Sequence, residues 1–178
     1  GINRHRLLKV ASQGTAVIDA DWNPDANSAV LAMEYDPSSQ TMYVGGAFTQ
    51  INGLPAQRIA RVSTLGAGAL DTGWNPSADN LVFTLAHDET ENVIFLGGWF
   101  THVNGTPRAR LAKLGTADTG VLDPLWDPSA DNSVATLARG GEYVYVGGYF
   151  SQLSGVEHAY LARVDAAGSG ALDPVWNP

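Results

Sequence analysis

The sequence has no cysteine and little charge. Without cysteine the chain forms no disulfide bond and offers neither a thiolate metal ligand nor a thiol nucleophile. Charged residues make up only 16% of the 178 residues, and the 10 Lys and Arg are outnumbered by 18 Asp and Glu. Nucleic acids and anionic membrane surfaces bind clusters of Lys and Arg, so we expect neither as a partner. No apolar run approaches the length of a membrane-spanning helix, and we therefore expect no membrane insertion.

The chain is nevertheless rich enough in apolar residues to build a core. Hydrophobic residues make up 44% of it, which is typical of a globular domain rather than a disordered chain. A length of 178 residues suits one domain. The first residues, GINRHRLLKV, include neither an initiating Met nor a signal peptide, so we interpret the sequence as a piece of a longer chain.

The chain repeats itself every 50 to 52 residues. A tryptophan followed by Asn-Pro or Asp-Pro occurs four times, with steps of 52, 52 and 50 residues, at Trp22, Trp74, Trp126 and Trp176. Pairs of adjacent glycines follow with steps of 52 and 50, at 45–46, 97–98 and 147–148. A third marker, RIARV at 58 with relatives at 6, 110 and 160, places a basic residue 13 residues before each tryptophan. Several markers at such regular spacing indicate a repeat architecture.

Each unit shows the same order of strand and turn signals. An alternating apolar run such as AVLAMEYD at 29 comes first, and a short turn and a run such as MYVGGAF follow. A loop with Asn-Gly or Ser-Gly then leads to the RIARV-like run and to a glycine-rich turn before the tryptophan. We expect three strands and a shorter fourth around ALD, with no helix longer than a turn.

The predicted fold is all-β, because four short strands in each repeat of this length make the size of a β-propeller blade. We expect about three complete four-stranded blades plus the outer strands of another, which is a partial ring. A β-solenoid is the main structural alternative, although its coils are usually shorter. The expected units are residues 1–24 for the outer strands of the incomplete blade, then 25–76, 77–128 and 129–178, which we name blade 1, blade 2 and blade 3.

Two adjacent glycines inside a strand weaken it and need an explanation. We interpret them as space for close packing, since each propeller blade is covered on both faces by its neighbours. Aromatic side chains of a neighbouring sheet are expected to fill that space, and the candidates are Phe48, Phe100, Phe150 and the repeated tryptophans. A β-bulge at the glycine pair is the alternative interpretation.

Other repeated residues are interpreted as scaffold, because a single active site needs only one copy of each residue. Asp71 and its counterparts in the other blades precede a turn and are expected to accept backbone N–H bonds there. Arg61 and its counterparts are expected to form an ion pair with a repeated Asp. The dipeptide Asn52-Gly53 suits a turn that needs positive φ.

These linked motifs resemble the delta-60 repeat family, a β-propeller group that is also described as a domain of unknown function. VGGAFTQINGLPAQRIARV at 44 and LGGWFTHVNGTPRARLAKL at 96 are similar to its repeat, and the similarity covers nearly the whole chain. The chain departs from the family in carrying Trp where Phe is usual before Asn-Pro, Ser154 for the Asn of the turn, and Tyr160 for Arg. The resemblance implies large bacterial proteins that are often secreted or surface-attached, and it brings no catalytic motif.

A binding site should break the repeat, so residues specific to one unit are its candidates. Trp99 and Tyr149 stand where blade 1 has Ala47, His102 stands where the other blades have Gln, and His87 ends the first strand of blade 2. We favour ordinary packing between blades for these aromatic residues. The alternative is that Trp99, Tyr149 and His102 form an aromatic sugar-binding surface.

The sequence predicts no metal site, no cofactor and no catalytic residue. No pair of His has metal-ligand spacing on one strand, and neither a Gly-x-Ser-x-Gly motif nor a phosphate-binding loop occurs. The acidic PSADN loops at 76 and 128 are more typical of turns than of Ca²⁺ sites. An enzyme needs several polar groups that converge at one place, whereas only His87 and Glu34 are assigned near the ends of innermost strands.

The leading functional hypothesis is a non-enzymatic extracellular or cell-surface module that binds a glycan or protein ligand or acts as a scaffold. The alternatives are a hydrolase or lyase that acts on polysaccharide in the central channel, and a purely structural spacer. Three and a half blades leave open sheet edges, so we expect the rest of a parent chain or another copy to complete the ring. Fold alone does not choose among these functions.

Overall fold

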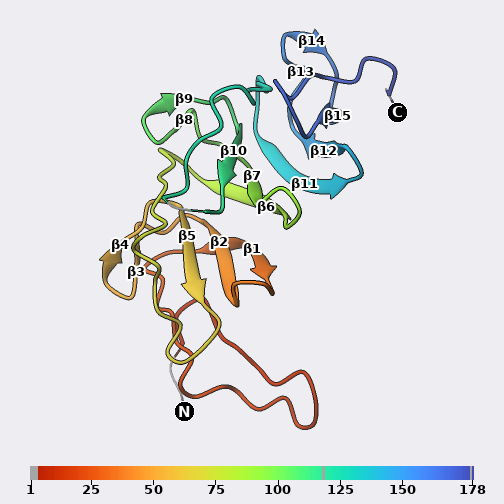
Figure 1. The fold of residues 1–178 in the computed structure, drawn as a ribbon. Helices are drawn as coiled ribbons and strands as arrows, with labels where there is room; N and C mark the ends of the chain where they lie inside the picture. The colour runs from red at the N-terminus through yellow and green to blue at the C-terminus, as the bar shows by residue number, and fades with distance from the viewer. Residues whose placement is uncertain (1–3, 118, 177) are drawn as a thin grey trace.

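The structure is a computed structural model that describes residues 4–117, 119–176 and 178. Three antiparallel sheets follow one another along the chain and fan out from the orange sheet near the N-terminus to the blue sheet near the C-terminus (Figure 1). The described residues form strands and turns, with no α-helix among them. No helix in this part of the chain could therefore span a membrane. The architecture is that of an all-β, partial β-propeller.

Blade 1 shows how each sheet is built. Strands β1 (Val30–Asp36), β2 (Thr41–Gly46) and β5 (Ile59–Ser63) form it in the order β1-β2-β5. The runs of alternating and β-branched residues therefore predicted these strands to within a residue or two at each end. The shorter fourth strand is a single bridge between Val62 and Leu70.

Blades 2 and 3 repeat this sheet. Blade 2 consists of β6 (Val82–Asp88), β7 (Val93–Gly98) and β10 (Leu111–Gly115). Blade 3 consists of β11 (Val134–Gly140), β12 (Tyr143–Gly148) and β15 (Leu161–Asp165). The fourth strand is again one bridge in each, from Leu114 to Leu122 and from Val164 to Leu172.

Each blade also carries a short hairpin that was predicted only as a loop. The hairpins are β3 (Gln50–Ile51) with β4 (Leu54–Pro55), β8 (His102–Val103) with β9 (Thr106–Pro107), and β13 (Gln152–Leu153) with β14 (Val156–Glu157). Their turns use positive φ as expected, for example 53° at Asn52 and 74° at Gly53. We name this end of the blades the hairpin rim, and the opposite end, with the turns between first and second strands, the turn rim.

The first strands of the blades are the innermost ones. Strand β1 packs against β6, and β6 packs against β11. The hydrophobic core lies between the sheets, since one cluster joins Tyr43 and Ile59 of blade 1 to Leu85 of blade 2. A second cluster joins Phe95 of blade 2 to Val134 of blade 3. Each blade is thus stabilised mainly by the face of its neighbour.

The first glycine of the pair leaves room for the next blade in blades 1 and 2. A Cβ on Gly45 would lie 2.7 Å from Cγ1 of Val82, and a Cβ on Gly97 would lie 2.6 Å from Cγ1 of Val134. These distances are too short for a side chain, so the packing interpretation is confirmed for this glycine. The predicted filling was wrong, because aliphatic side chains from the first strand of the next blade, rather than aromatic rings, occupy the space.

The second glycine of each pair accommodates a β-bulge, so the alternative interpretation also holds. Strand β1 carries an extra residue between Val30 and Ala32, opposite Gly45 and Gly46. A Cβ on Gly46 would overlap the carbonyl oxygen of Ala29. A side chain is therefore excluded at the two glycines for different reasons: Gly45 faces the neighbouring blade, and Gly46 faces the bulge of its own blade.

The repeated tryptophans and their neighbours are scaffold, as predicted. Trp74 is fully buried, and its ring centroid lies 5.1 Å from that of Tyr43. The carboxylate of Asp71 accepts the backbone N–H groups of Gly73 and Trp74, at 2.9 and 3.3 Å. It also forms an ion pair with Arg61, with 2.6 Å between the closest atoms. Blade 2 repeats the ion pair between Lys113 and Asp123, and blade 3 repeats it between Arg163 and Asp173.

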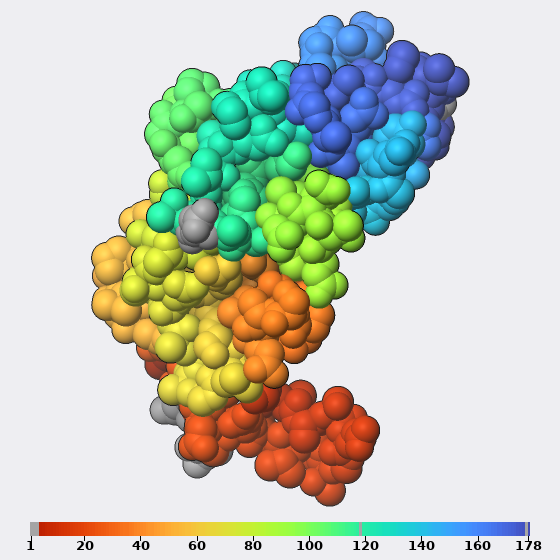
Figure 2. All heavy atoms as spheres, in the orientation of Figure 1, coloured from red at the N-terminus to blue at the C-terminus, as the bar shows by residue number. Residues whose placement is uncertain are grey.

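The N-terminal segment, residues 4–24, covers the outer part of blade 1. Its Leu7 and Trp22 are buried in one cluster with Ala60 and Val62. The rest of the segment projects from the body of the molecule as the red lobe in Figure 2. The segment has the bridge of a third and fourth strand, between Val10 and Ile18, and so corresponds to the outer strands of a further blade.

Candidate binding site

Trp99 and Tyr149 lie on the hairpin rim with their side chains in solvent. Their exposed fractions are 53% and 70%, so the favoured interpretation that they pack between blades was wrong. Each directly follows a glycine pair, where the second strand ends. The N–H of Trp99 donates to the carbonyl of Leu81 at 2.8 Å, and that of Tyr149 donates to Ser133 at 2.9 Å. These bonds fix the backbone of each residue against the segment before the first strand, and the aromatic side chain points into solvent.

Tyr160 adds a second exposed aromatic side chain beside Tyr149. Its exposed fraction is 67%, and its φ of 69° repeats a left-handed position that arginine holds in the other units. The carbonyl of Tyr160 accepts the N–H of Gly148 at 2.9 Å, and its N–H donates to Phe150 at 3.0 Å. These two bonds flank Tyr149, so the backbones of the two tyrosines lie on adjacent chain segments. The replacement of Arg by Tyr was visible in the sequence, but nothing there indicated that the ring is exposed.

A hollow of about 320 Å³ lies in the same part of blade 3. The residues around it are Ser151, Gln152, Glu157, His158 and Ala159. Gln152 and Glu157 are exposed and face each other across the β13–β14 hairpin. His158 is buried, and its Nδ1 has no hydrogen-bond partner among the described residues. An exposed aromatic pair and a polar hollow thus lie within a dozen residues of chain.

His102 has a structural partner on the hairpin rim. Its Nδ1 lies 3.2 Å from the carboxylate of Asp79, which also accepts the hydroxyl of Thr101 at 2.7 Å. Burial raises the pKa of Asp79, but the hydrogen bonds from Thr101 and His102 outweigh it and lower the pKa to about 2. In blade 3 the hydroxyl of Ser151 donates the equivalent hydrogen bond to the carboxylate of Asp131, at 2.6 Å. His102 therefore helps to fix the first loop of blade 2 against its hairpin, and it does not line the hollow of blade 3.

His87 does not join the other candidates. It lies near the turn-rim end of β6, where it pairs with Ile94, whereas Trp99 follows the opposite end of β7. The ring of His87 lies 5.2 Å from that of Tyr43, between blades 1 and 2. Glu34, the other residue assigned near an innermost-strand end, is half-buried, and burial raises its pKa. The structure therefore places the predicted site residues on two opposite rims.

A larger cavity of about 670 Å³ opens between blades 2 and 3 at the turn rim. Asp88 of blade 2 and Arg139 of blade 3 form an ion pair across it, at 2.6 Å. Burial raises the pKa of Asp88, but hydrogen bonds from Glu91 and Arg139 outweigh it and keep the pKa below its usual value. Other charged residues around the cavity are Glu91, Lys113, Glu142 and Asp165. No group of His, Asp and Glu side chains suited to a metal ion occurs in the part of the chain that the structure describes.

Comparison with known families identifies the repeat. The model of a family described as "Domain of unknown function (DUF5122) beta-propeller" matches residues 41–73, 92–124 and 144–174, which together exceed half of the chain. The chain belongs to this family. Each DUF5122 match begins at the second strand of a blade and ends just before the tryptophan. No curated protein and no solved structure matches the chain significantly.

The candidate site lies inside the third DUF5122 match. The third match contains Tyr149, Gln152, Glu157 and Tyr160, so all of them belong to the repeat unit itself. The family description names no ligand and no activity for this unit. The functional interpretation of the hairpin rim therefore depends on the chemistry of blade 3.

Proposed function

We propose that this DUF5122 segment is a non-enzymatic binding module, and that the hairpin rim of blade 3 binds carbohydrate. The observation that supports this most is that Tyr149 and Tyr160 are both exposed on the two chain segments that lead to the polar hollow. Covering an exposed aromatic side chain with a partner is favourable, because it removes apolar surface from water. Two exposed aromatic side chains on adjacent chain segments therefore present a surface suited to a ligand.

The chemistry around the hollow suits a sugar. The apolar C–H face of a pyranose stacks on an aromatic ring, and its hydroxyl groups need both donors and acceptors at the edge. Gln152 offers an amide that donates and accepts, and Glu157 offers a carboxylate that accepts. Aromatic faces and mixed polar groups are thus available together.

The site is specific to blade 3, as a functional site should be. Blade 1 has Ala47 at the position of Tyr149 and Arg58 at the position of Tyr160. Scaffold residues such as the tryptophans recur in every unit, whereas a single ligand needs one site only. The combination of Tyr149, Tyr160, Gln152 and Glu157 occurs once in the chain.

The wider setting is also a proposal. The resemblance to the delta-60 repeat supports a location outside the cell or on its surface, and an adhesive or scaffolding role for the whole protein. A protein ligand at the same rings is the second candidate, because exposed tyrosines are common in protein interfaces. Protease treatment of intact source cells tests the location: a surface protein is digested, and an internal one is protected.

A glycan array followed by titration calorimetry tests the proposed ligand. We expect binding of one class of glycan, and at least about a fivefold weaker affinity for Tyr149→Ala and for Tyr160→Ala, because each ring contributes about 1 kcal/mol or more. Tyr35→Ala is the matched control, since that tyrosine is exposed elsewhere and its loss should leave binding unchanged. Equal affinity of all three variants would contradict the site, and no binding on the array would contradict the ligand class.

The same experiment tests the enzymatic alternative. A hydrolase or lyase would use carboxylates, and the cavity between blades 2 and 3 gathers four of them, Asp88, Glu91, Glu142 and Asp165. Chromatography of the glycans after incubation detects any cleavage. Cleavage that Asp88→Asn abolishes would favour the enzyme, whereas intact glycan with measurable binding favours the binding module.

A further inference from the structure

The cavity between blades 2 and 3 lies where the chain departs from its own repeat. The turn between the first and second strands has two residues in blade 3, 141–142, whereas it has four in blade 1, 37–40, and four in blade 2, 89–92. A shorter turn covers less of the neighbouring blade. Both residues of the short turn, Gly141 and Glu142, line the cavity.

Smaller side chains line this cavity than face the junction between blades 1 and 2. At that junction the hydroxyl of Tyr43 accepts a hydrogen bond from Arg61 at 3.5 Å. The guanidinium of Arg61 also donates to the carbonyl of Thr116 at 2.5 Å. The corresponding residues between blades 2 and 3 all line the cavity, and each is the smaller one: Phe95, Lys113 and Ala166. A phenolic oxygen, a guanidinium and a threonine side chain are thus missing from this junction, and space remains in their place.

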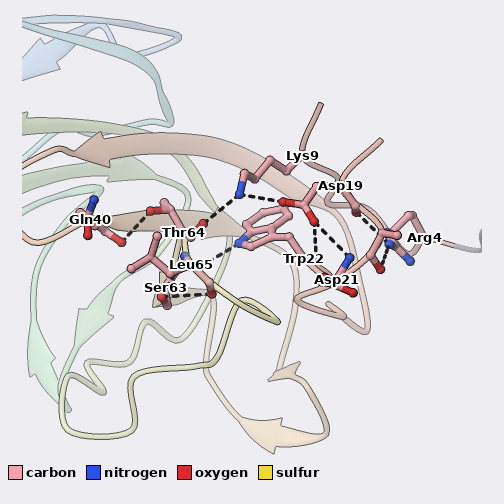
Figure 3. Close-up of polar contacts among 10 residues, drawn as sticks. Arg4, Lys9, Asp19, Asp21, Trp22, Gln40, Ser63, Thr64 and Leu65 are labelled. Carbon is pink, nitrogen blue, oxygen red and sulfur yellow. Dashed lines mark hydrogen bonds and ion pairs between the residues drawn. The ribbon is translucent and has the colours of Figure 1, made fainter. Parts of the chain in front are cut away.

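The counterpart of Ala166 in blade 1 shows what the larger side chain does. The hydroxyl of Thr64 donates to the carbonyl of Gln40 at 2.7 Å (Figure 3), and its backbone N–H donates to the same carbonyl at 3.0 Å. In blade 3 the N–H of Ala166 keeps the second bond, to the carbonyl of Glu142 at 2.9 Å, but alanine has no hydroxyl for the first. The outer turn of blade 3 therefore leaves more room beside the cavity.

The two basic side chains around the cavity are already paired. Arg139 forms the ion pair with Asp88 across the cavity. The ammonium of Lys113 lies 3.1 Å from the carboxylate of Asp123 and donates to the carbonyl of Ala166 at 3.2 Å. An anionic ligand would have to displace these partners, so the cavity does not suit a phosphate or a carboxylate.

Three further carboxylates around the cavity have no cation of their own. Glu91, Glu142 and Asp165 are exposed, and none of them forms an ion pair within the part of the chain that the structure describes. They do not converge on one point as metal ligands would, because the described residues contain no group suited to a metal ion. Carboxylates spread around a space of about 670 Å³ suit a cation whose charges are themselves spread along its length.

The cavity also has an apolar wall. Val93 and Phe95 line it from the second strand of blade 2, and Ala166 and Ala167 line it from the outer turn of blade 3. Methylene groups gain free energy when such a surface removes them from water. A fitting ligand therefore combines separated positive charges with short hydrocarbon segments.

We propose that this cavity binds a linear polyamine, in which ammonium groups are joined by short methylene chains. The ammonium groups pair with Glu91, Glu142 and Asp165, and the methylene chains lie against the apolar wall. The polyamine site lies at the turn rim and the proposed carbohydrate site lies at the hairpin rim, so each proposal can fail without the other.

Spermidine is the probe, titrated into the whole chain by calorimetry in about 150 mM NaCl, which screens diffuse attraction to an acidic protein. We expect saturable binding, and an affinity about fivefold weaker for Glu142→Gln, which removes one carboxylate. Glu89→Gln is the matched control. Glu89 is exposed in the same turn as Glu91 but does not line the cavity, so its loss should leave the affinity unchanged.

The Lys113→Arg variant tests the space in the cavity rather than its charge. It carries the residue that blades 1 and 3 have at this position, so it should fold, and its melting curve checks that it does. We expect at least about fivefold weaker binding, because the longer side chain fills space that the ligand needs. Absence of saturable binding overturns the proposal, and so does an equal loss for Glu89→Gln and Glu142→Gln. Equal affinity of Lys113→Arg and the unchanged chain overturns it as well, since binding would then depend on charge alone.

Discussion

The indole Nε1 of Trp74 in blade 1 donates a hydrogen bond to the carbonyl oxygen of Gly115 in blade 2, at 2.9 Å. The same bond joins Trp126 to Asp165 at 2.8 Å, one blade further along the chain. A glycine in the outer turn of the next blade makes the approach possible, since a Cβ on Gly120 would lie 3.0 Å from that Nε1. Trp74 and Trp126 therefore each contact two blades, which accounts for the position of this tryptophan in the repeat.

Replacement of Trp74 by Phe should destabilise the chain. The variant keeps an apolar ring but leaves the half-buried carbonyl of Gly115 without its donor, which costs about 1 kcal/mol. Trp74→Ala should cost about 3–5 kcal/mol, because it also leaves a cavity. Urea unfolding followed by far-UV circular dichroism measures both. Trp99→Phe on the exposed rim is the control, and a loss there equal to that of Trp74→Phe would contradict the assigned role.

Replacement of Gly97 by Ala should be rescued by a smaller neighbour. The added Cβ would lie 2.6 Å from Cγ1 of Val134, and overpacking of this kind costs about 1–3 kcal/mol. Val134→Ala removes that methyl group, so the double variant should recover part of the loss in a double-mutant cycle. Gly98→Ala is the matched control, because its Cβ would meet the backbone carbonyl of Leu81. Strict additivity for Gly97 and Val134 would show that the two blades do not touch there.

Replacement of Ser154 by Asn should stabilise the chain. Ser154 has a φ of 52°, in a turn where the other blades have Asn. Asn104, its counterpart in blade 2, accepts the N–H of Ser77 at 2.8 Å and donates to the carbonyl of Gly120 at 3.2 Å. The variant should gain the equivalent bonds and relieve the left-handed backbone, for about 1 kcal/mol. A lower unfolding free energy for Ser154→Asn would contradict this account of the turn.

Acid should unfold the chain partly through Asp36. Burial raises the pKa of this carboxyl, but hydrogen bonds from Ser38 and Ser39 outweigh it and lower the pKa to about 2. A carboxyl with a depressed pKa stabilises the folded state above its unfolded pKa of about 4, and this contribution is lost as the pH falls toward 2. We expect Asp36→Asn to flatten the fall of unfolding free energy between pH 5 and pH 2 by roughly 2 kcal/mol. An unchanged pH dependence would show that Asp36 is not the titrating group.

Much of the fold could be predicted from the sequence because the repeat shows each signal several times. Four tryptophans at nearly constant spacing fixed the length of the unit, and alternation along residues 29–36 placed the first strand. The contacts of the glycines could not be predicted in the same way. Which residues of the next blade face Gly45 depends on the bulge between Val30 and Ala32, and a bulge shifts the facing pattern without any marker in the sequence.

The candidate site was predicted less well, for a related reason. Trp99 and Tyr149 stand one residue beyond the end of a strand, where alternation no longer tells which way a side chain points. Large aromatic residues are usually buried, and only the structure shows that these two side chains point away from the sheet into solvent. Tyr160 was visible as a departure from the repeat, but its nearness to Tyr149 depends on the pairing of segments far apart in the unit. His87 was grouped with residues that the structure places on the other rim.

The most direct test of the proposed binding site is an NMR titration of the ¹⁵N-labelled chain with the best glycan from the array. The account predicts that the largest amide shifts fall within residues 148–160, at the two tyrosines and around the hollow of blade 3. Largest shifts at the turn rim, around Asp88 and Arg139, would contradict it, and so would shifts spread evenly over the three blades.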